Sequence, residues 1–325
     1  YESILSHGFV MDGKGLKMSK SLGNQIFPED ILKKYGADIL RVWVAASDYS
    51  EDLRIDYSIL DQHAEAYRKI RNTFRYLMGN INDNYSEQEF SKIDLSKLPE
   101  LEKLMLHKLY VLNEKFNTNF KEYNFHALYK ELLNFCTVDL SSFYFDIRKD
   151  TLYCDNKNSE KRQNCILILK TILEVLLKWF APILSFTTEE IFSLLNQDEK
   201  NSIHLKKFPE FPKSWKNEEL YKNWEKINKI RDITNISIEE KRATKIIGSS
   251  LETAVDIKLS KDLYDLAKNY DFSEICITSL ANVVLDEKLK DQIEVKTSKA
   301  KGKKCSICWK IKENECERHP ICNFK

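Results

Sequence analysis

Apolar residues at helical spacing run through about 190 consecutive positions of this 325-residue chain, from Ser58 to residue 247. The spacing is clearest at the start of the run, where basic side chains lie off an apolar stripe made of Ile59, Ala66, Tyr67, Ile70, Phe74 and Leu77. The same pattern predicts further helices over residues 100–121, 124–147, 161–180, 187–196 and 217–243. Long amphipathic helices bury their apolar faces against one another, so residues 58–247 are predicted to form an antiparallel helical bundle.

The segment before the bundle has a different pattern. Residues 1–57 mix short apolar runs with turns, and strand pieces are expected at Ile4–Leu5 and Phe9–Met11. Proline and acidic residues favour the first turn of a helix, which predicts a short helix from Pro28, and a second helix is expected over residues 38–46. This mixture indicates the end of an α/β domain.

The segment after the bundle changes pattern again. Alternating apolar and polar residues predict a strand over residues 254–259, a helix is expected over 261–269, and more strands are expected at 275–277, 283–285 and 293–295. Residues 248–298 therefore indicate a small α/β subdomain, which leads into a cysteine-rich segment over residues 299–325.

Composition limits the class of protein only broadly. The 51 Lys and Arg residues nearly balance the 50 Asp and Glu residues, so the net charge of +1 does not indicate a nucleic-acid-binding protein, although a local basic face is compatible with it. The sequence has no run of about 18 apolar residues and no signal-peptide pattern. We expect a soluble, cytoplasmic protein that has no membrane partner.

The short string Lys17-Met18-Ser19-Lys20-Ser21 lies between glycines, with Gly13 and Gly15 before it and Gly23 after it. Two lysines and two hydroxyl groups on a loop that can close over a ligand are suited to bind a polyphosphate. Such a loop would act electrostatically, because its lysines neutralise the charge that develops on a leaving pyrophosphate. The alternative is a pair of solvated surface lysines.

This string is the second signature of class I aminoacyl-tRNA synthetases, and its surroundings resemble the bacterial isoleucyl enzymes, with valyl and leucyl enzymes sharing much of the pattern. The resemblance covers essentially the whole chain. It rests on the segments His7–Asn24, Pro28–Asp30, Gly36–Ala45, Phe143–Asp150 and Ala181–Ile191. It implies a multidomain, mostly α protein: the end of a Rossmann-like α/β catalytic domain (1–57), a helical anticodon-binding bundle (58–247), a small α/β subdomain (248–298) and a zinc finger (299–325).

The resemblance also implies roles for the loop residues. Lys20 would be the main ATP-binding and catalytic residue, supported by Lys17, while Ser19 and Ser21 would order the loop or contact phosphate. ATP would be bound with Mg²⁺. The family's first ATP-binding signature, of the His-Ile-Gly-His type, and its inserted editing domain do not occur in this sequence, and most of the amino-acid pocket is missing too. We therefore expect a carboxy-terminal fragment that is inactive by itself.

Four cysteines lie within the last 21 residues. Cys305 and Cys308 offer two thiolates at a spacing that one turn can present to a metal, and Cys316 and His319 form a second pair at the same spacing. Together they predict a Cys3His structural zinc site with no open coordination position. Cys322 could replace His319 or Cys316. The alternative is a group of reduced surface cysteines.

The finger also resembles the carboxy-terminal zinc finger of bacterial isoleucyl enzymes, which matches over Gly302–Trp309. The second half of that family finger is commonly Cys-x-Arg-Cys, whereas this chain has His319 at the last position. The departure leaves the fourth ligand open between His319 and Cys322.

Other candidate contacts in the bundle are ambiguous from sequence alone. The aromatic residues Trp179, Phe180, Trp215 and Trp224 are expected in the core rather than as stacking partners of bases. The basic residues Arg68, Lys69, Arg71 and Arg75 fit a solvated helix face as well as phosphate contacts. The resemblance favours tRNA binding, since unpaired anticodon bases are recognised by stacking and by hydrogen bonds to their edges.

The function that these features predict is that of an isoleucine–tRNA ligase, with isoleucine, ATP and tRNA(Ile) as partners, acting as a monomer. Two alternatives remain open. One is a fragment of a valyl or leucyl enzyme, which the Cys-x2-Cys-Trp finger disfavours. The other is a non-catalytic RNA-binding protein with a vestigial loop.

Overall fold

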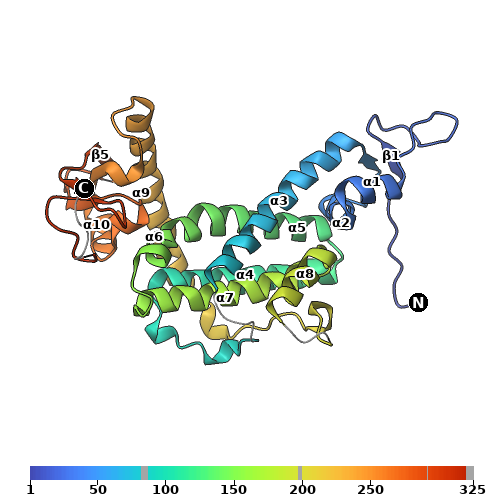
Figure 1. The fold of residues 1–325 in the computed structure, drawn as a ribbon, viewed down its shortest axis with the longest axis horizontal. Helices are drawn as coiled ribbons and strands as arrows, with labels where there is room; N and C mark the ends of the chain where they lie inside the picture. Colours follow the sequence, from blue (N-terminus) through green and yellow to red (C-terminus); the bar gives the residue numbers. More distant parts are fainter. Residues whose placement is uncertain (82–86, 197–199, 291, 320–325) are drawn as a thin grey trace. The chain divides into compact units, whose positions relative to one another are not determined.

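The computed structural model describes residues 1–81, 87–196, 200–290 and 292–319, and the chain is mostly helical with several domains (Figure 1). Its contacts divide it into two compact units. The first contains residues 1–98, 108–144 and 166–216, and the second contains residues 99–107, 145–165 and 217–325. Each unit combines stretches that are separate in the sequence, so the units do not test the domain boundaries predicted at residues 57, 247 and 298. These boundaries stay predictions. No helix in the described ranges is long and apolar enough to cross a membrane.

The amino-terminal part of the first unit is a small α/β arrangement. Strand β1 (Val10–Asp12) pairs in parallel with β2 (Leu53–Ile55), and helices α1 (Pro28–Tyr35) and α2 (Ala37–Ala46) lie between them in the sequence. A proline and two acidic residues begin α1, as the sequence predicted. Gly36, at φ 83°, separates the two helices. The core of this part contains Ile31, Ile39, Trp43, Leu53, Ile55 and Leu60.

The predicted strand piece at Ile4–Leu5 is wrong. These residues form no regular element, and their side chains are exposed. Strand β2 was not predicted, since three residues are too few to show an alternating pattern.

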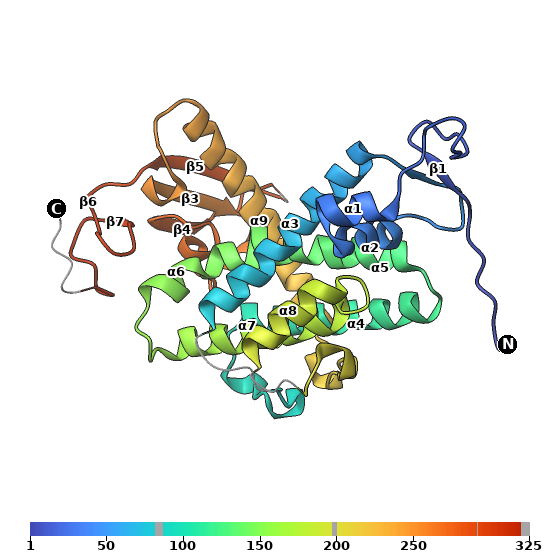
Figure 2. The same cartoon turned by 45° about the vertical axis from the view of Figure 1, so that its right-hand side comes forward.

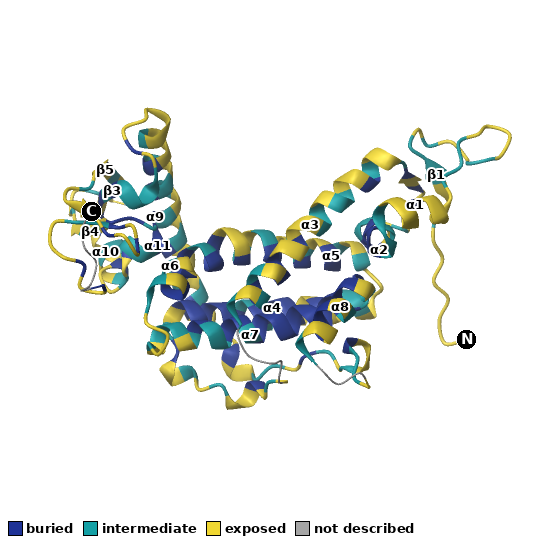
Figure 3. Cartoon of the chain, in the orientation of Figure 1, coloured by how far each residue is buried: buried dark blue, intermediate teal, exposed yellow. Residues whose placement is uncertain are grey.

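The rest of the first unit is helical. The bundle contains α3 (Tyr57–Asn80), α5 (Phe125–Asn134) and α8 (Ser185–Leu195), with the larger parts of α4 (Glu100–Lys121) and α7 (Glu160–Phe180), which both continue into the second unit. Figure 3 shows the buried faces of α4 and α7. Short 3-10 helices occur at Phe90–Lys92, Leu95–Lys97, Ile203–Leu205 and Lys213–Trp215.

Aromatic packing fills the bundle core. Phe74 of α3 contacts Phe180 of α7 at a ring distance of 6.0 Å, and Phe116 of α4 stacks on Trp179 at 5.6 Å. Trp179, Phe180, Trp215 and Trp224 are all buried, which confirms that they are core residues. Arg68, Lys69, Arg71 and Arg75 lie exposed on α3, where Arg68 pairs with Glu65 at 2.9 Å.

The prediction of one continuous α-helix over residues 124–147 is wrong, because the helix type changes within this range. The chain follows α5 with a π-helical stretch, Phe135–Phe145, before α6 (Asp146–Cys154) begins. Within this stretch the Ser142 hydroxyl donates to the carbonyl of Thr137, five residues earlier, at 3.0 Å. The wider turn changes which side chains face the core, and a pattern based on 3.6 residues per turn does not reveal it.

The second unit contains α9 (Glu218–Ala243) and a three-stranded sheet, with a 3-10 turn at Ser250–Glu252 before it. Strand β3 (Thr253–Leu259) is central, pairing in parallel with β4 (Leu280–Leu285) and antiparallel with β5 (Glu294–Lys299). Figure 2 shows α9 beside this sheet, where the hydroxyls of Ser237 and Thr297 lie 2.8 Å apart. Short helices α10 (Lys261–Ala267) and α11 (Phe272–Ile275) connect β3 to β4.

The strand predicted at residues 275–277 is wrong, because Ile275 ends α11 and Ile277 lies in a turn at φ 56°. The carboxylate of Asp271 accepts hydrogen bonds from the backbone N–H groups of Ser273 and Glu274, which starts a helical turn. The other predicted strands, at 254–259, 283–285 and 293–295, fall on or next to β3, β4 and β5.

A buried ion network joins three elements of the second unit. Arg148 of α6 donates to both carboxylate oxygens of Glu102 at 2.6 Å, and its remaining nitrogen donates to Glu274 at 2.7 Å. The side chains of Arg148 and Glu102 are 3% and 0% exposed. The network therefore holds the first turn of α6 against α4 and α11.

Candidate phosphate-binding loop and metal centre

The loop at Lys17–Ser21 follows β1 and is shaped by the carboxylate of Asp12. One Asp12 oxygen accepts from the backbone N–H groups of Lys14 at 3.0 Å and Leu16 at 2.8 Å, and the other accepts from the side-chain amide of Asn24 at 2.8 Å. These hydrogen bonds, that of Asn24 first, lower the pKa of Asp12. One carboxylate thus connects the two ends of the loop.

Asn24 completes this arrangement from the other side. Its side-chain carbonyl accepts from the backbone N–H of Ser19 at 2.9 Å, and its amide also donates to the carbonyl of Lys17 at 3.3 Å. The hydroxyls of Ser19 and Ser21 lie 3.1 Å apart, and Ser19 accepts from the N–H of Leu22 at 3.3 Å. The sequence pattern alone does not reveal these roles of Asp12 and Asn24, although Asx residues next to glycines are typical of turns.

Met18 anchors the loop while the two lysines face solvent. Its side chain packs against the core cluster that contains Ile31, Ile39 and Trp43. Lys17 and Lys20 are exposed, and neither ammonium group forms an ion pair with a residue in the described ranges. Both charges are therefore available to an anionic ligand.

The predicted metal ligands lie together at the end of the described chain. The ligand atoms of Cys305, Cys308, Cys316 and His319 all lie within 4.8 Å of one another, and the four residues are buried. Nδ1 of His319 is 3.6 Å from Sγ of Cys305 and 3.4 Å from Sγ of Cys316, and Sγ of Cys308 is 3.9 Å from that of Cys316. Cys322, the other candidate, lies outside the described residues.

Backbone geometry presents the first two cysteines. Strands β6 (Lys303–Lys304) and β7 (Ile311–Lys312) form a hairpin, in which the N–H of Cys305 donates to the carbonyl of Lys310 at 2.9 Å. The N–H of Trp309 then donates to the carbonyl of Cys305 at 3.0 Å, which closes a turn around the thiols. The turn thus points both sulfur atoms to one side.

The cluster fits a tetrahedral zinc ion. With Zn–S bonds of about 2.3 Å and Zn–N bonds of about 2.0 Å, tetrahedral geometry requires ligand separations of roughly 3.5 to 3.8 Å. The three closest separations in the cluster, 3.4, 3.6 and 3.9 Å, lie in this range or within about 0.1 Å of it. The other ring nitrogen of His319 donates to the carbonyl of Cys154 at 2.8 Å, as is usual for a ligating histidine. His319 therefore lies where it could complete a four-ligand set with the three cysteines.

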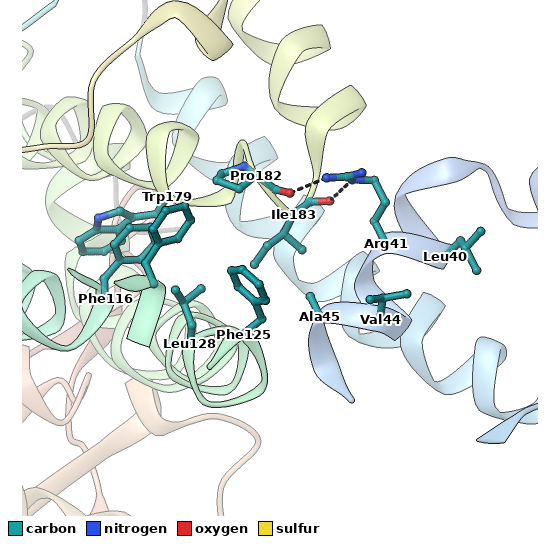
Figure 4. A pocket seen from close by; sticks show the side chains of 11 residues that line it. Leu40, Arg41, Val44, Ala45, Phe116, Phe125, Leu128, Trp179, Pro182 and Ile183 are labelled. Carbon is teal, nitrogen blue, oxygen red and sulfur yellow. Dashed lines mark hydrogen bonds between the residues drawn. The ribbon is translucent and has the colours of Figure 1, made fainter. Parts of the chain in front are cut away.

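The first unit also contains an apolar cavity of about 500 Å³ between α2 and the bundle. Figure 4 shows its aromatic wall, which includes Phe116, Phe125 and Trp179. The Arg41 guanidinium at its rim donates to the carbonyls of Pro182 at 2.6 Å and Ile183 at 3.0 Å. Arg41 is the charged residue of the cavity lining, and these hydrogen bonds already pair its guanidinium with backbone carbonyls. We therefore do not assign ATP binding to this cavity.

Comparisons with known proteins agree with the loop and with the bundle. Residues 1–56 match the model of class I tRNA synthetases (I, L, M and V), and residues 102–259 match the anticodon-binding domain of tRNA ligases. The isoleucine–tRNA ligase of Pelagibacter ubique is 65% identical over 98% of this chain and 35% of that protein. Those of Agrobacterium fabrum and Geobacter sulfurreducens are 42% and 41% identical, each over 96% of this chain. The chain spans about a third of the length of these relatives.

Proposed function

The chain belongs to the isoleucyl family of class I aminoacyl-tRNA synthetases, and we propose that it works as part of an isoleucine–tRNA ligase. Such an enzyme activates isoleucine with ATP to an aminoacyl adenylate and then transfers the aminoacyl group to tRNA(Ile). The 65% identity over nearly the whole chain carries the proposal, and favours isoleucine over valine and leucine. We also propose a cytoplasmic monomer.

Lys20 and Lys17 are proposed to bind the phosphates of ATP. Their ammonium groups are exposed on a loop that Asp12, Asn24 and Met18 hold in place. Charge on the leaving pyrophosphate increases in the transition state, and a preorganised positive charge stabilises it most there. ATP would bring Mg²⁺ with it, and the loop itself would supply no general base.

The test of this role is Lys20→Ala in the intact enzyme, measured by isoleucine-dependent ATP–pyrophosphate exchange. We expect the exchange rate to fall about 100-fold or more, because losing one preorganised charge removes roughly 3 kcal/mol of transition-state stabilisation. Lys14→Ala, on the same loop but outside the string, is the matched control and should change the rate little. Unchanged exchange in Lys20→Ala would contradict the assignment and favour a non-catalytic RNA-binding protein.

The finger is proposed to contact the anticodon of tRNA through Trp309. Its side chain is 60% exposed, and the ammonium of Lys304 lies 5.5 Å from its ring centroid. An exposed aromatic ring beside a positive charge is suited to stack on an unpaired base next to a phosphate.

Replacing Trp309 measures that contact. We expect Trp309→Ala to weaken tRNA(Ile) binding by about 1 to 3 kcal/mol, since stacking on one base contributes that much. Trp309→Phe keeps an aromatic face and should recover most of the affinity. Equal affinity of Trp309→Ala and the unchanged protein in a filter-binding titration would rule out the contact.

The four clustered ligands are proposed to hold one structural zinc ion. No position in the set Cys305, Cys308, Cys316 and His319 would remain for water or substrate, so the ion would stabilise the finger rather than take part in catalysis. Metal analysis of the purified protein should give one zinc per chain.

A further inference from the structure

The end of α6 carries three groups that face the metal finger. Asp150 lies in its last turns, Asp155 is its carboxy-terminal cap, and the backbone carbonyl of Cys154 lies between them. Each of the three accepts a hydrogen bond from the segment Arg318–His319. These two consecutive residues therefore connect the finger to one helix end.

Arg318 binds the two carboxylates at once. Its Nη1 donates to Asp150 at 2.5 Å, its Nε donates to Asp155 at 3.1 Å, and its Nη2 donates to the same Asp155 oxygen. The side chains are 35%, 23% and 18% exposed for Arg318, Asp150 and Asp155. Such partial burial and forked geometry make these pairs stronger than ordinary surface salt bridges.

His319 makes the neighbouring contact. Its Nε2 lies 2.8 Å from the carbonyl of Cys154, a group that accepts hydrogen bonds but cannot donate them, so this contact favours a proton on Nε2. With the proton there, the lone pair that can bind a metal lies on Nδ1, the atom that faces Cys305 and Cys316. Docking on α6 thus selects the tautomer that can bind a metal.

We infer that Arg318 is a positioning residue, which holds the finger on the end of α6 so that the Cys154 carbonyl keeps Nδ1 of His319 directed at the metal. This inference rests on the proposed zinc site. It also gives a reason for histidine at position 319, because a cysteine there could bind zinc but could not donate to Cys154. Contacts of this kind around a metal ligand change metal affinity about 10- to 100-fold.

The test is the rate at which the full chain, loaded with zinc, loses the metal to a chromogenic chelator. We expect Arg318→Ala to release zinc about 10-fold faster than the unchanged protein. Arg318→Lys keeps one charge contact, so its rate of zinc release should lie between those of Arg318→Ala and the unchanged protein. The double variant Asp150→Asn with Asp155→Asn should resemble Arg318→Ala. Arg242→Ala removes an exposed pair with Glu239 on α9 and should release zinc at the original rate.

A second measurement separates positioning from general stability. His319→Cys should still bind one metal, show the cobalt spectrum of a four-sulfur site, and respond much less to Arg318→Ala, because it has lost the bond to Cys154. If Arg318→Ala does not fold, the Asp150 and Asp155 variants give the same answer.

Two results would count against these assignments in different ways. A protein that binds no stoichiometric zinc would overturn the metal site itself. A protein that binds zinc but releases it at equal rates with and without the Arg318 contacts would overturn the inference and leave the zinc site in place.

Discussion

Gly302 occupies a position in the finger that no other residue fits without strain. Its φ is 117°, and a Cβ atom added to it would lie 2.0 Å from the carbonyl oxygen of Lys312 on the facing strand. L-residues rarely adopt this conformation, and a contact of 2.0 Å with backbone forces the hairpin apart. The glycine therefore allows β6 and β7 to approach and to set the turn that carries Cys305 and Cys308.

We expect Gly302→Ala to destabilise the finger by about 1 to 3 kcal/mol, measured as a lower zinc affinity in competition with a chelator. The control is Gly79→Ala in α3, where a Cβ meets nothing within 4 Å and the conformation is helical. That change should leave zinc affinity unaltered and stabilise the protein slightly. Equal zinc affinities of Gly302→Ala and the unchanged protein would show that the hairpin can relax.

At this scale the sequence predicted that Cys305, Cys308, Cys316 and His319 lie together, and the structure brings them into one cluster. Their metal-binding role and the ATP-binding role of the loop lysines stay predictions. These residues were recognisable because thiolates and ammonium groups at short fixed spacings have few other uses. The supporting residues were not. Asp12, Asn24, Asp150 and Arg318 act through hydrogen bonds to residues that only the folded chain brings near, and their own types are common on any surface.

Among the elements, α6 connects the ion network of the second unit to the finger. Its first turn carries Arg148, which is fully engaged with Glu102 and Glu274, and its last residues carry the groups that accept bonds from Arg318 and His319. We therefore expect a change in the Arg148 contacts at the first turn of α6 to affect the contacts of Arg318 and His319 at its last residues. The sequence pattern did not separate α6 from α5, because the π-helical turns between them interrupt the spacing without a proline or glycine.

We expect Arg148→Met to destabilise the chain by about 3 to 5 kcal/mol in urea unfolding, because it removes the guanidinium that pairs with the buried carboxylate of Glu102. The double variant Arg148→Met with Glu102→Leu should recover much of this loss, since apolar residues replace both charges. Lys149→Ala, which removes the neighbouring exposed pair with Asp146, should cost less than about 1 kcal/mol. If Arg148→Met also lowers the free energy of unfolding by less than about 1 kcal/mol, the buried ion network contributes little to stability.

For the whole molecule, each compact unit combines stretches that are far apart in the sequence, and α4 and α7 contribute residues to both units. The four consecutive parts expected from the sequence stay a prediction. Helical spacing shows that a helix has an apolar face but not which partner covers it. Family resemblance was more informative, since the relatives are isoleucine–tRNA ligases over nearly the full length of this chain.

Removal of the proposed zinc ion should separate the stability of the finger from that of the first unit. The first unit buries a large aromatic core around Phe116, Trp179 and Phe180, whereas the finger has two short strands, a small cluster of cysteines and a few polar contacts with the end of α6. Small metal sites of this kind obtain most of their folding free energy from the ion. We expect a strong chelator to remove hydrogen-exchange protection from residues 303–319 and from the end of α6, while the bundle helices of the first unit keep theirs. Cys316→Ser should produce the same pattern without chelator, and loss of protection throughout the bundle would show that folding of the first unit also depends on the metal.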